Sequence, residues 1–313
     1  MTADFISITV FFLLTLFIIS LILWILNNRK YVSSENVASA YDSWTKDKLL
    51  ERLWGEHIHL GFYNPKIKKI DFREAKIEFV HQLVRWSGLD NLPKGSRILD
   101  VGCGIGGSAR ILANHYGFNV IGITLSQEQV KRARQLTPEN CNCTFKVMDA
   151  LNIDFEEGEF DGIWSVEAGA HIYDKERFAD EILRILRPGG YLALADWNSR
   201  DLTKSPPSFF EKIVLKQLLE QWVHPSFISI NGFSDILSRN INSSGLIQSA
   251  NWNIYTNPSW IDSIIEGIRR PNAILSLGPL AMIKSIREIP TIILMNWAFS
   301  SGLMQFGVYK CRG

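Results

Sequence analysis

The segment from Ile98 to Gly107, with the sequence ILDVGCGIGG, limits the possible folds of this chain more than any other segment. The apolar residues around Asp100 are typical of a buried strand, and the glycines that follow allow the backbone to turn sharply against a ligand. An apolar helical pattern begins directly after the turn, at Ala109. Open α/β sheets bind nucleotide-like ligands at such a strand-to-helix turn.

The glycine motif alone is compatible with two kinds of ligand. Gly102, Gly104 and Gly107 satisfy the G-x-G-x-x-G pattern of dinucleotide-binding proteins, which usually carry an acidic residue about twenty positions further on for the ribose. The next expected strand ends in the sequence VIGITLS (residues 120–126), which has no carboxylate. Asp100 stands inside the motif instead, where it can hold a cationic group. S-adenosylmethionine carries an ammonium and a sulfonium and no phosphate, so the pattern favours it as the cofactor.

Strand and helix patterns alternate through the middle of the chain. We expect strands at residues 97–101, 119–124, 143–148, 160–165 and 190–196, with helices at 107–116, 126–136 and 175–186 between them. Further helices are expected at 38–53, 72–86, 207–222, 258–268 and 279–300, and further strands at 245–255 and 302–311. Alternation with short connections predicts a Rossmann-like α/β fold: a mostly parallel sheet with helices on both faces.

The N-terminal segment, residues 5–26, contains no charged side chain. Twenty-two residues at roughly 1.5 Å each span about 33 Å, enough to cross a hydrocarbon layer of about 30 Å. A cleaved signal peptide is the alternative, but it would need a basic start and a small-residue cleavage site. We therefore expect a retained transmembrane helix. Arg29 and Lys30 follow it, which places the rest of the chain on the cytoplasmic side.

Net charge and cysteine usage exclude other classes of function. The 313-residue chain has a net charge of +1 and no basic stripe, so we expect no nucleic-acid partner. The four cysteines, among them Cys141 and Cys143 in a C-x-C pair, lack a second ligand pair at zinc spacing. We expect ordinary thiols and no metal.

Two aromatic or apolar segments outside the glycine-motif region also bear on function. The sequence WGEHIHLGFY (residues 54–63) is rich in aromatic residues and histidine, and we expect it to form a cap over the cofactor. The stretch from Ile289 to Phe299 is too short to span a bilayer and is interrupted by Pro290, so a core helix is expected. A face that enters the bilayer surface is the alternative, with interfacial charges at Arg269, Arg270, Lys284 and Arg287.

Several short motifs resemble those of a known family. The sequences MDA (148–150), FDGIWSVE (160–167) and LRPGG (186–190), together with the glycine motif, resemble the class I methyltransferases over residues 94–197. The sequences GITLSQEQ (122–129), WGEHIH (54–59) and WSVEAGAH (164–171) are similar to the tocopherol and sterol methyltransferase branch; cyclopropane fatty acid synthases share part of the first. The segments ADWN (195–198), QWVHP (221–225) and KSIREIPT (284–291) are similar to cyanobacterial methyltransferases of 2-methyl-6-phytyl- and 2-methyl-6-solanesyl-benzoquinol.

The resemblance implies the positions of a cofactor site. Asp100, Gly102 and Gly104, with Cys103 in the same turn, would line the methionine end of S-adenosylmethionine. The ribose would contact Thr124, Ser126 and Gln129. The adenine would contact Asp149 and Ala150, at the end of the third strand. The absence of a carboxylate on the second strand departs from the general class I pattern. Asp149 is alternatively a helix cap or a turn residue.

Ring methylation requires an electron-rich carbon aligned with the sulfonium methyl group, and loss of a phenolic proton raises the nucleophilicity of the ring. His171 follows the fourth strand at the ligand-binding edge and is the first candidate for the base. Glu167, His57 and His59 are further candidates, and each is alternatively structural.

The resemblance implies methylation of a prenylated hydroquinone lipid on the route to tocopherol and plastoquinone. The expected organisation is an anchor with tether (1–33), a helical cap (34–95), a cofactor-binding core (96–197) and a substrate-binding part that completes the sheet (198–313). Methylation of γ-tocopherol or a sterol is the nearest alternative. A membrane-tethered NAD-dependent oxidoreductase and a non-catalytic binding module are the others.

Overall fold

A seven-stranded sheet in the order β3-β2-β1-β4-β5-β7-β6 forms the centre of the computed structural model. The structure describes residues 11, 14–22, 24, 29–67, 70–240 and 246–312. The strands are β1 (Arg97–Val101), β2 (Asn119–Thr124), β3 (Cys143–Val147), β4 (Phe160–Val166), β5 (Leu186–Ser199), β6 (Gln248–Asn251) and β7 (Met304–Arg312). Strands β1 to β5 pair in parallel, and β7 is antiparallel to both of its neighbours. The expected mostly parallel Rossmann-like sheet is confirmed.

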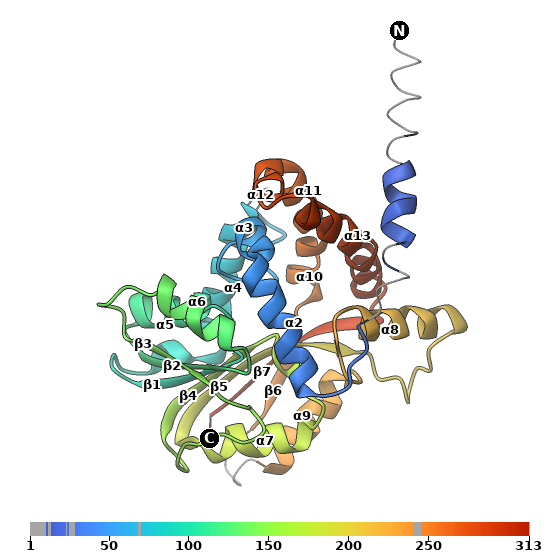
Figure 1. Cartoon of the computed structure of the whole chain (residues 1–313). Helices are drawn as coiled ribbons and strands as arrows, with labels where there is room; N and C mark the ends of the chain where they lie inside the picture. The colour runs from blue at the N-terminus through green and yellow to red at the C-terminus, as the bar shows by residue number, and fades with distance from the viewer. Residues whose placement is uncertain are drawn as a thin grey trace.

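Helices cover both faces of this sheet (Figure 1). One face packs against α4 (Phe72–Ser87), α5 (Gly107–Tyr116), α6 (Gln127–Leu136), α8 (Phe209–Gln221), α10 (Asn253–Thr256), α11 (Pro258–Arg269) and α13 (Pro279–Ser300). Helix α12 (Pro271–Leu275) packs on α11 and α13. The opposite face packs against α7 (Lys175–Arg184) and α9 (Ile230–Asn240). Three short helices, α9, α10 and α12, were not predicted from the sequence.

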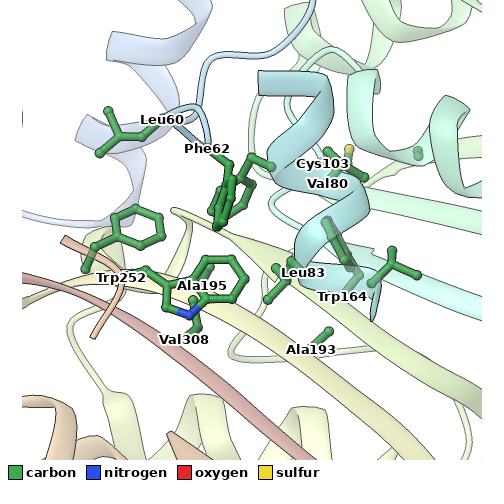
Figure 2. Packing of buried hydrophobic residues seen from close by; sticks show 14 of the residues in the cluster. Leu60, Phe62, Val80, Leu83, Cys103, Trp164, Ala193, Ala195, Trp252 and Val308 are labelled. Carbon is green, nitrogen blue, oxygen red and sulfur yellow. The ribbon is translucent and has the colours of Figure 1, made fainter. Parts of the chain in front are cut away.

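The core beneath α4 is aromatic and dry (Figure 2). Val80 and Leu83 of α4 point down onto Trp164 of β4, and all three are fully buried. Phe62 and Trp252 extend this layer toward β7, with ring centroids 5.4 Å apart in an edge-to-face arrangement. Such packing fixes the strand ends that hold the expected site, because close-packed interiors tolerate little displacement.

The expected helix over residues 38–53 is two helices, α2 (Ser34–Asp47) and α3 (Leu49–Trp54). Lys48 separates them in a left-handed backbone conformation with φ 56°. Helix α2 packs against α6 and α3. It begins at Ser34, four residues before the expected start at residue 38.

The last apolar stretch belongs to α13, which continues through Pro290 without a break. Met295, Ala298 and Phe299 of its second half are buried, as expected of a core helix. The alternative, in which Arg287 is an interfacial charge, does not hold. Its side chain is buried, and it donates to Gln221 Oε1 (2.8 Å) and Glu288 Oε1 (2.5 Å).

Half of the expected transmembrane segment, residues 5–26, lies outside the described residues. Residues 14–22 are helical and lie beside α13 (Figure 1). Ser20 Oγ donates to the Ile286 carbonyl (2.6 Å), and Trp24 Nε1 donates to Thr291 Oγ1 (2.9 Å). Within the part of the chain that the structure describes, no helix has the length and apolar character needed to cross a bilayer.

Candidate active site

One cavity of about 710 Å³ joins the glycine turn to the helices above the sheet. The ends of β1, β2 and β4 supply its floor, and residues from α2, α3, α11 and α13 close it from the other side. All of the predicted site residues line it: Asp100, Gly102, Cys103, Gly104, Thr124, Ser126, Gln129, Asp149, Ala150, Glu167, His171 and His59. The structure therefore brings together residues that are up to about one third of the chain apart in sequence. Its volume is typical of a small-molecule site.

The glycine turn has the backbone conformation that only glycine adopts easily. Gly102 and Gly104 have φ values of 78° and 53°, in the left-handed region. The start of α5 is covered, since a Cβ on Gly107 would lie 2.4 Å from the Glu56 carbonyl oxygen and 2.9 Å from His57 Nδ1. A pyrophosphate needs that helix start free. The geometry therefore fits S-adenosylmethionine better than a dinucleotide.

A glycine-to-alanine substitution at position 102 should damage this turn severely. Its Cβ would lie 2.2 Å from the Ala168 Cβ, in addition to the strain of a positive φ. We expect Gly102→Ala to lower the free energy of unfolding by about 2–3 kcal/mol and to weaken cofactor binding. Gly95→Ala is the matched control, because Gly95 has φ 84° and open space around its Cβ. Denaturant unfolding and calorimetry measure both variants; equal losses in the two would contradict the steric account.

Asp100 is the buried charge at the cofactor end of the cavity. It lies at the end of β1, is 2% exposed, and its Oδ2 atom has no hydrogen-bond partner among the described residues. Burial raises the pKa of this carboxyl group to about 7. An unpartnered buried carboxylate is costly, so a cationic ligand group in front of it would be bound strongly. The residues present thus fit the charged methionine end of S-adenosylmethionine.

Cofactor affinity should consequently depend on pH. A cationic group binds the ionised form of Asp100, and the proton must leave before or during binding. We expect the Kd to rise as the pH falls below about 7, approaching tenfold per unit, and to be flat above about 8. Calorimetry in buffers of different ionisation enthalpy should show proton release at pH 6.5. A Kd unchanged between pH 5.5 and 8 would contradict this role.

The residues expected at the ribose and adenine already have protein partners. Thr124 Oγ1 donates to Gln129 Oε1 (2.7 Å), so these two form a polar pair at the end of β2. Ser126 caps α6, accepting from the Gln129 amide (3.0 Å) and donating to Asp42 Oδ1 (2.5 Å). Asp149 Oδ1 accepts from the Leu151 amide (2.9 Å) in a turn, which leaves its second oxygen for a ligand. Asp149 is therefore the turn residue that the alternative expected, Ser126 is a helix cap, and both leave room for ligand contacts.

Glu167 occupies the centre of the cavity in a strained backbone conformation. Its φ of 55° is one of three positive values at non-glycine positions in the described chain. Its Oε1 accepts from the Leu60 amide (2.6 Å), which ties β4 to the aromatic segment. Burial raises the pKa of this carboxyl to about 8, against a lowering influence of the Leu60 hydrogen bond. Strain and a pKa near neutrality are typical of functional side chains.

His171 forms a hydrogen-bonded pair with Tyr41 of α2. Its Nδ1 faces the Val223 carbonyl (3.4 Å), which can only accept, so Nδ1 carries the proton and Nε2 accepts from the Tyr41 hydroxyl (2.9 Å). His224 stacks on the His171 ring, with centroids 4.1 Å apart. Burial lowers the pKa of His171 to about 4. His171 is therefore neutral at physiological pH and a weak base.

His57 and His59 form a second neutral pair. His59 Nδ1 donates to the Leu60 carbonyl (2.8 Å), so His59 Nε2 is an acceptor and receives the hydrogen of His57 Nδ1 (3.2 Å). Burial lowers the pKa of His59 to about 3. Both nitrogens of His59 are thereby used within the protein, which assigns it a positioning role rather than direct proton transfer. His57 also lines the cavity.

Three tryptophans form a wall that sequence reasoning did not predict. Trp197 of β5 lies 5.6 Å from Trp222 and 5.4 Å from Trp260 of α11, measured between ring centroids. All three line the cavity next to His224, as does Tyr41. A signal was present, since Trp197 and Trp222 lie within the segments ADWN and QWVHP that carry the family resemblance, but nothing in the sequence joins them to α11. The cavity is also lined by aliphatic side chains and a methionine: Leu50, Leu53, Ile264, Ile274, Met282, Ile286, Ile289 and Ile292.

No group of three or more histidine, cysteine, aspartate or glutamate side chains within the described residues is arranged to hold a metal ion. All four cysteines have free thiols, and Cys141 and Cys143 approach to 3.5 Å between their sulfur atoms without a disulfide.

Comparison with known proteins gives consistent matches. Residues 99–194 match the family model described as a methyltransferase domain. The 2-methyl-6-phytyl-1,4-hydroquinone methyltransferase of Synechocystis is 53% identical over 289 residues, covering 92% of this chain and 91% of the relative. The chloroplastic tocopherol O-methyltransferase of Arabidopsis thaliana is 33% identical, covering 84% and 78%. The solved cyclopropane synthase MmaA2 of Mycobacterium tuberculosis, at 16% identity, shares the fold with a TM-score of 0.75, over 90% of this chain and 99% of that one.

Proposed function

Because this chain belongs to the S-adenosylmethionine-dependent methyltransferases that include the 2-methyl-6-phytyl-1,4-hydroquinone and tocopherol methyltransferases, we propose that it methylates a ring carbon of a prenylated hydroquinone. The substrates we infer are 2-methyl-6-phytyl- and 2-methyl-6-solanesyl-benzoquinol, on the route to tocopherol and plastoquinone. The high identity to the Synechocystis relative over nearly the whole of both chains favours this choice over γ-tocopherol or a sterol.

The observation that carries the proposal is the composition of the cavity lining. The glycine turn and the unpartnered carboxylate of Asp100 suit a cationic cofactor. The side chains of Trp197, Trp222 and Trp260 suit a flat ring. The leucine and isoleucine side chains of α3, α11, α12 and α13 suit an isoprenoid chain. A prenylated hydroquinone combines these last two parts.

S-adenosylmethionine supplies a methyl group on a positively charged sulfur. We propose that Asp100 binds its cationic end, with Cys103 and the backbone of Gly102 and Gly104 beside it. We assign the ribose to Thr124, Ser126 and Gln129. The adenine is assigned to Asp149 and Ala150. The orphaned Asp100 oxygen and the polar Thr124–Gln129 pair support this arrangement.

We propose that Glu167 takes the proton from a quinol hydroxyl. A general base is most effective when its pKa lies near the operating pH, and Glu167 meets this better than His171, whose pKa is lowered to about 4. His171 then acts with Tyr41 as a neutral pair that orients the ring by hydrogen bonding. The apolar walls exclude water and hold the ring carbon in line with the methyl group, which supplies much of the rate.

We also propose that residues 5–26 anchor the chain in a membrane, with the catalytic part on the cytoplasmic side. The support is the uncharged sequence of that segment and the basic residues after it. A prenyl chain partitions into the bilayer by about 0.8 kcal/mol per CH₂, so a membrane-bound enzyme is held where its substrate is concentrated.

The proposal is tested with full-length protein in vesicles that contain the phytyl quinol, using S-adenosylmethionine labelled at its methyl group. We expect the label on a ring carbon, seen by NMR of the extracted product. Label on a quinol oxygen would overturn the proposed chemistry. Calorimetry with NAD on the same protein separates the oxidoreductase alternative, for which binding of NAD would be required.

A further inference from the structure

The end of the molecule formed by α11, α12 and the start of α13 carries exposed apolar side chains. We call this region, residues 268–283, the α11–α13 tip. Ile268, Leu275 and Leu280 are 73%, 60% and 72% exposed, and Met282 and Ile283 are also exposed. The tip stands above the sheet, at the end of the molecule opposite α7 and α9 (Figure 1). Five large apolar side chains gathered at one end indicate a surface that is covered in use.

The charges around the tip are arranged with the positive groups outward. Arg269 and Arg270 of α11 are half-exposed, whereas the carboxylate of Glu266 that both of them face is 1% exposed. Arg52 of α3 donates to Ser276 Oγ (2.7 Å), and Arg73 of α4 lies in the same shallow pocket. The acidic partners are thus inside and the guanidinium groups outside. An anionic surface complements this arrangement.

The active-site cavity extends to the same tip. Ile268 of α11, Ile274 of α12 and Met282 of α13 line both the tip and the far end of the cavity. Leu16 of the N-terminal helical residues also lines the cavity, and Ser20 is hydrogen-bonded to the Ile286 carbonyl. The segment expected to enter the membrane therefore leaves the molecule beside the opening through which the prenyl chain would pass.

We propose that the α11–α13 tip docks into the surface of an anionic lipid bilayer, so that the prenyl chain passes from the bilayer into the cavity beside α13. This inference rests on the proposed prenyl-quinol function for the occupant of the cavity, but the docking itself does not. Apolar side chains enter the headgroup region while the surrounding arginines contact anionic lipid headgroups. A second protein chain would not need the cavity to open at this surface.

Depth-sensitive labelling of the full-length protein in vesicles tests the docking. Cys103, Cys141 and Cys311 are buried, so a Cys143→Ser background allows labelling at Leu280→Cys with a fluorophore. Leu246→Cys is the matched control, since Leu246 is the same residue type with the same 72% exposure and precedes β6. In vesicles with about one third anionic lipid, we expect lipid-attached nitroxides to quench the Leu280 label at least threefold more than the Leu246 label, with the reverse order for aqueous iodide.

Equal iodide quenching of the two labels would overturn the proposal. So would a Leu280 label protected from both quenchers, because that pattern indicates a protein partner. The double substitution Arg269→Gln with Arg270→Gln should reduce lipid quenching of the Leu280 label. When docking is weak, the loss of each charge should lower the docked fraction of the protein roughly fivefold. Quenching that is unaffected by these substitutions and by removal of anionic lipid would refute the electrostatic part.

Turnover tests the passage of the substrate. Leu275 and Leu280 do not line the cavity, and we expect Leu275→Glu with Leu280→Glu to raise the KM for phytyl quinol in vesicles about tenfold. The kcat/KM for a short-chain quinol in solution should stay unchanged, as should both values in Leu246→Glu. Equal effects on the two substrates would contradict passage through the tip. Failure to methylate any quinol would instead refute the proposed function, and the labelling result would still decide the docking.

Discussion

Replacing Glu167 by glutamine should lower kcat by a factor of about 10² to 10⁴ while the Kd for S-adenosylmethionine changes little, because general base catalysis contributes that much. Glutamine keeps the shape of the side chain and the hydrogen bond from the Leu60 amide (2.6 Å). It cannot accept the proton of the quinol. Single-turnover kinetics with prebound cofactor measures the chemical step directly.

The pH profile provides the control for this substitution. Burial raises the pKa of Glu167 to about 8, so the ionised, competent fraction grows as the pH rises toward 8 and is nearly complete above 9. The wild-type rate should follow that rise, and Glu167→Gln should lack it. A loss of a hundredfold or more in His171→Gln, with Glu167→Gln unaffected, would assign the proton transfer to the histidine instead.

Replacing Asp100 by asparagine should weaken S-adenosylmethionine binding by about 2–5 kcal/mol, or roughly thirtyfold to several thousandfold in Kd. The reason is that the substitution leaves a cationic ligand group facing a neutral amide in a buried site. The proton release expected near pH 6.5 should disappear with the carboxyl group. Calorimetry measures both quantities on the same samples.

The unfolding temperature distinguishes a lost cofactor contact from damage to the fold. The pKa of Asp100 is raised from 3.8 to about 7, so the folded state retains a proton that the unfolded chain has lost between these values. Its contribution to stability therefore falls as the pH rises from about 4 to about 7 and is constant above. Asp100→Asn should accordingly unfold at a higher temperature than the wild type at pH 8, despite binding less cofactor. A variant that is both less stable and unable to bind would indicate damage to the fold.

The parallel strands could be predicted closely from the sequence because each is a short buried run with a turn signal after it. The bounds of β1 and β2 agree with the expectation at both ends. In β5 the paired region starts earlier, at Leu186, and the register shifts between Phe160 and Gly162. The expected turn at residues 186–190 is thus a bulge within the strand. Such irregularities depend on how a strand pairs with its neighbour, and the sequence of one strand alone does not specify that pairing.

The candidate site could be predicted only where a motif marks a strand end. Asp100 lies at the end of β1 and Glu167 directly follows β4, so their common location could be inferred from parallel topology. Tyr41 lies on α2, whose position depends on the left-handed turn at Lys48, and the tryptophan wall depends on the packing of α11 against β5. These are tertiary contacts between distant segments. Arg287 decides between the two interpretations of α13, because its charge is paired inside the protein, as in a core helix, and does not lie at an interface.

The most direct test of the central claim is the kcat/KM of the full-length enzyme for a panel of lipids in the same vesicles: 2-methyl-6-phytyl-benzoquinol, 2-methyl-6-solanesyl-benzoquinol, γ-tocopherol and a sterol. A cavity lined by Asp100, the tryptophan wall and aliphatic side chains predicts turnover of one or both benzoquinols, at least a hundredfold more efficient than that of γ-tocopherol. Turnover of γ-tocopherol or the sterol alone would contradict it.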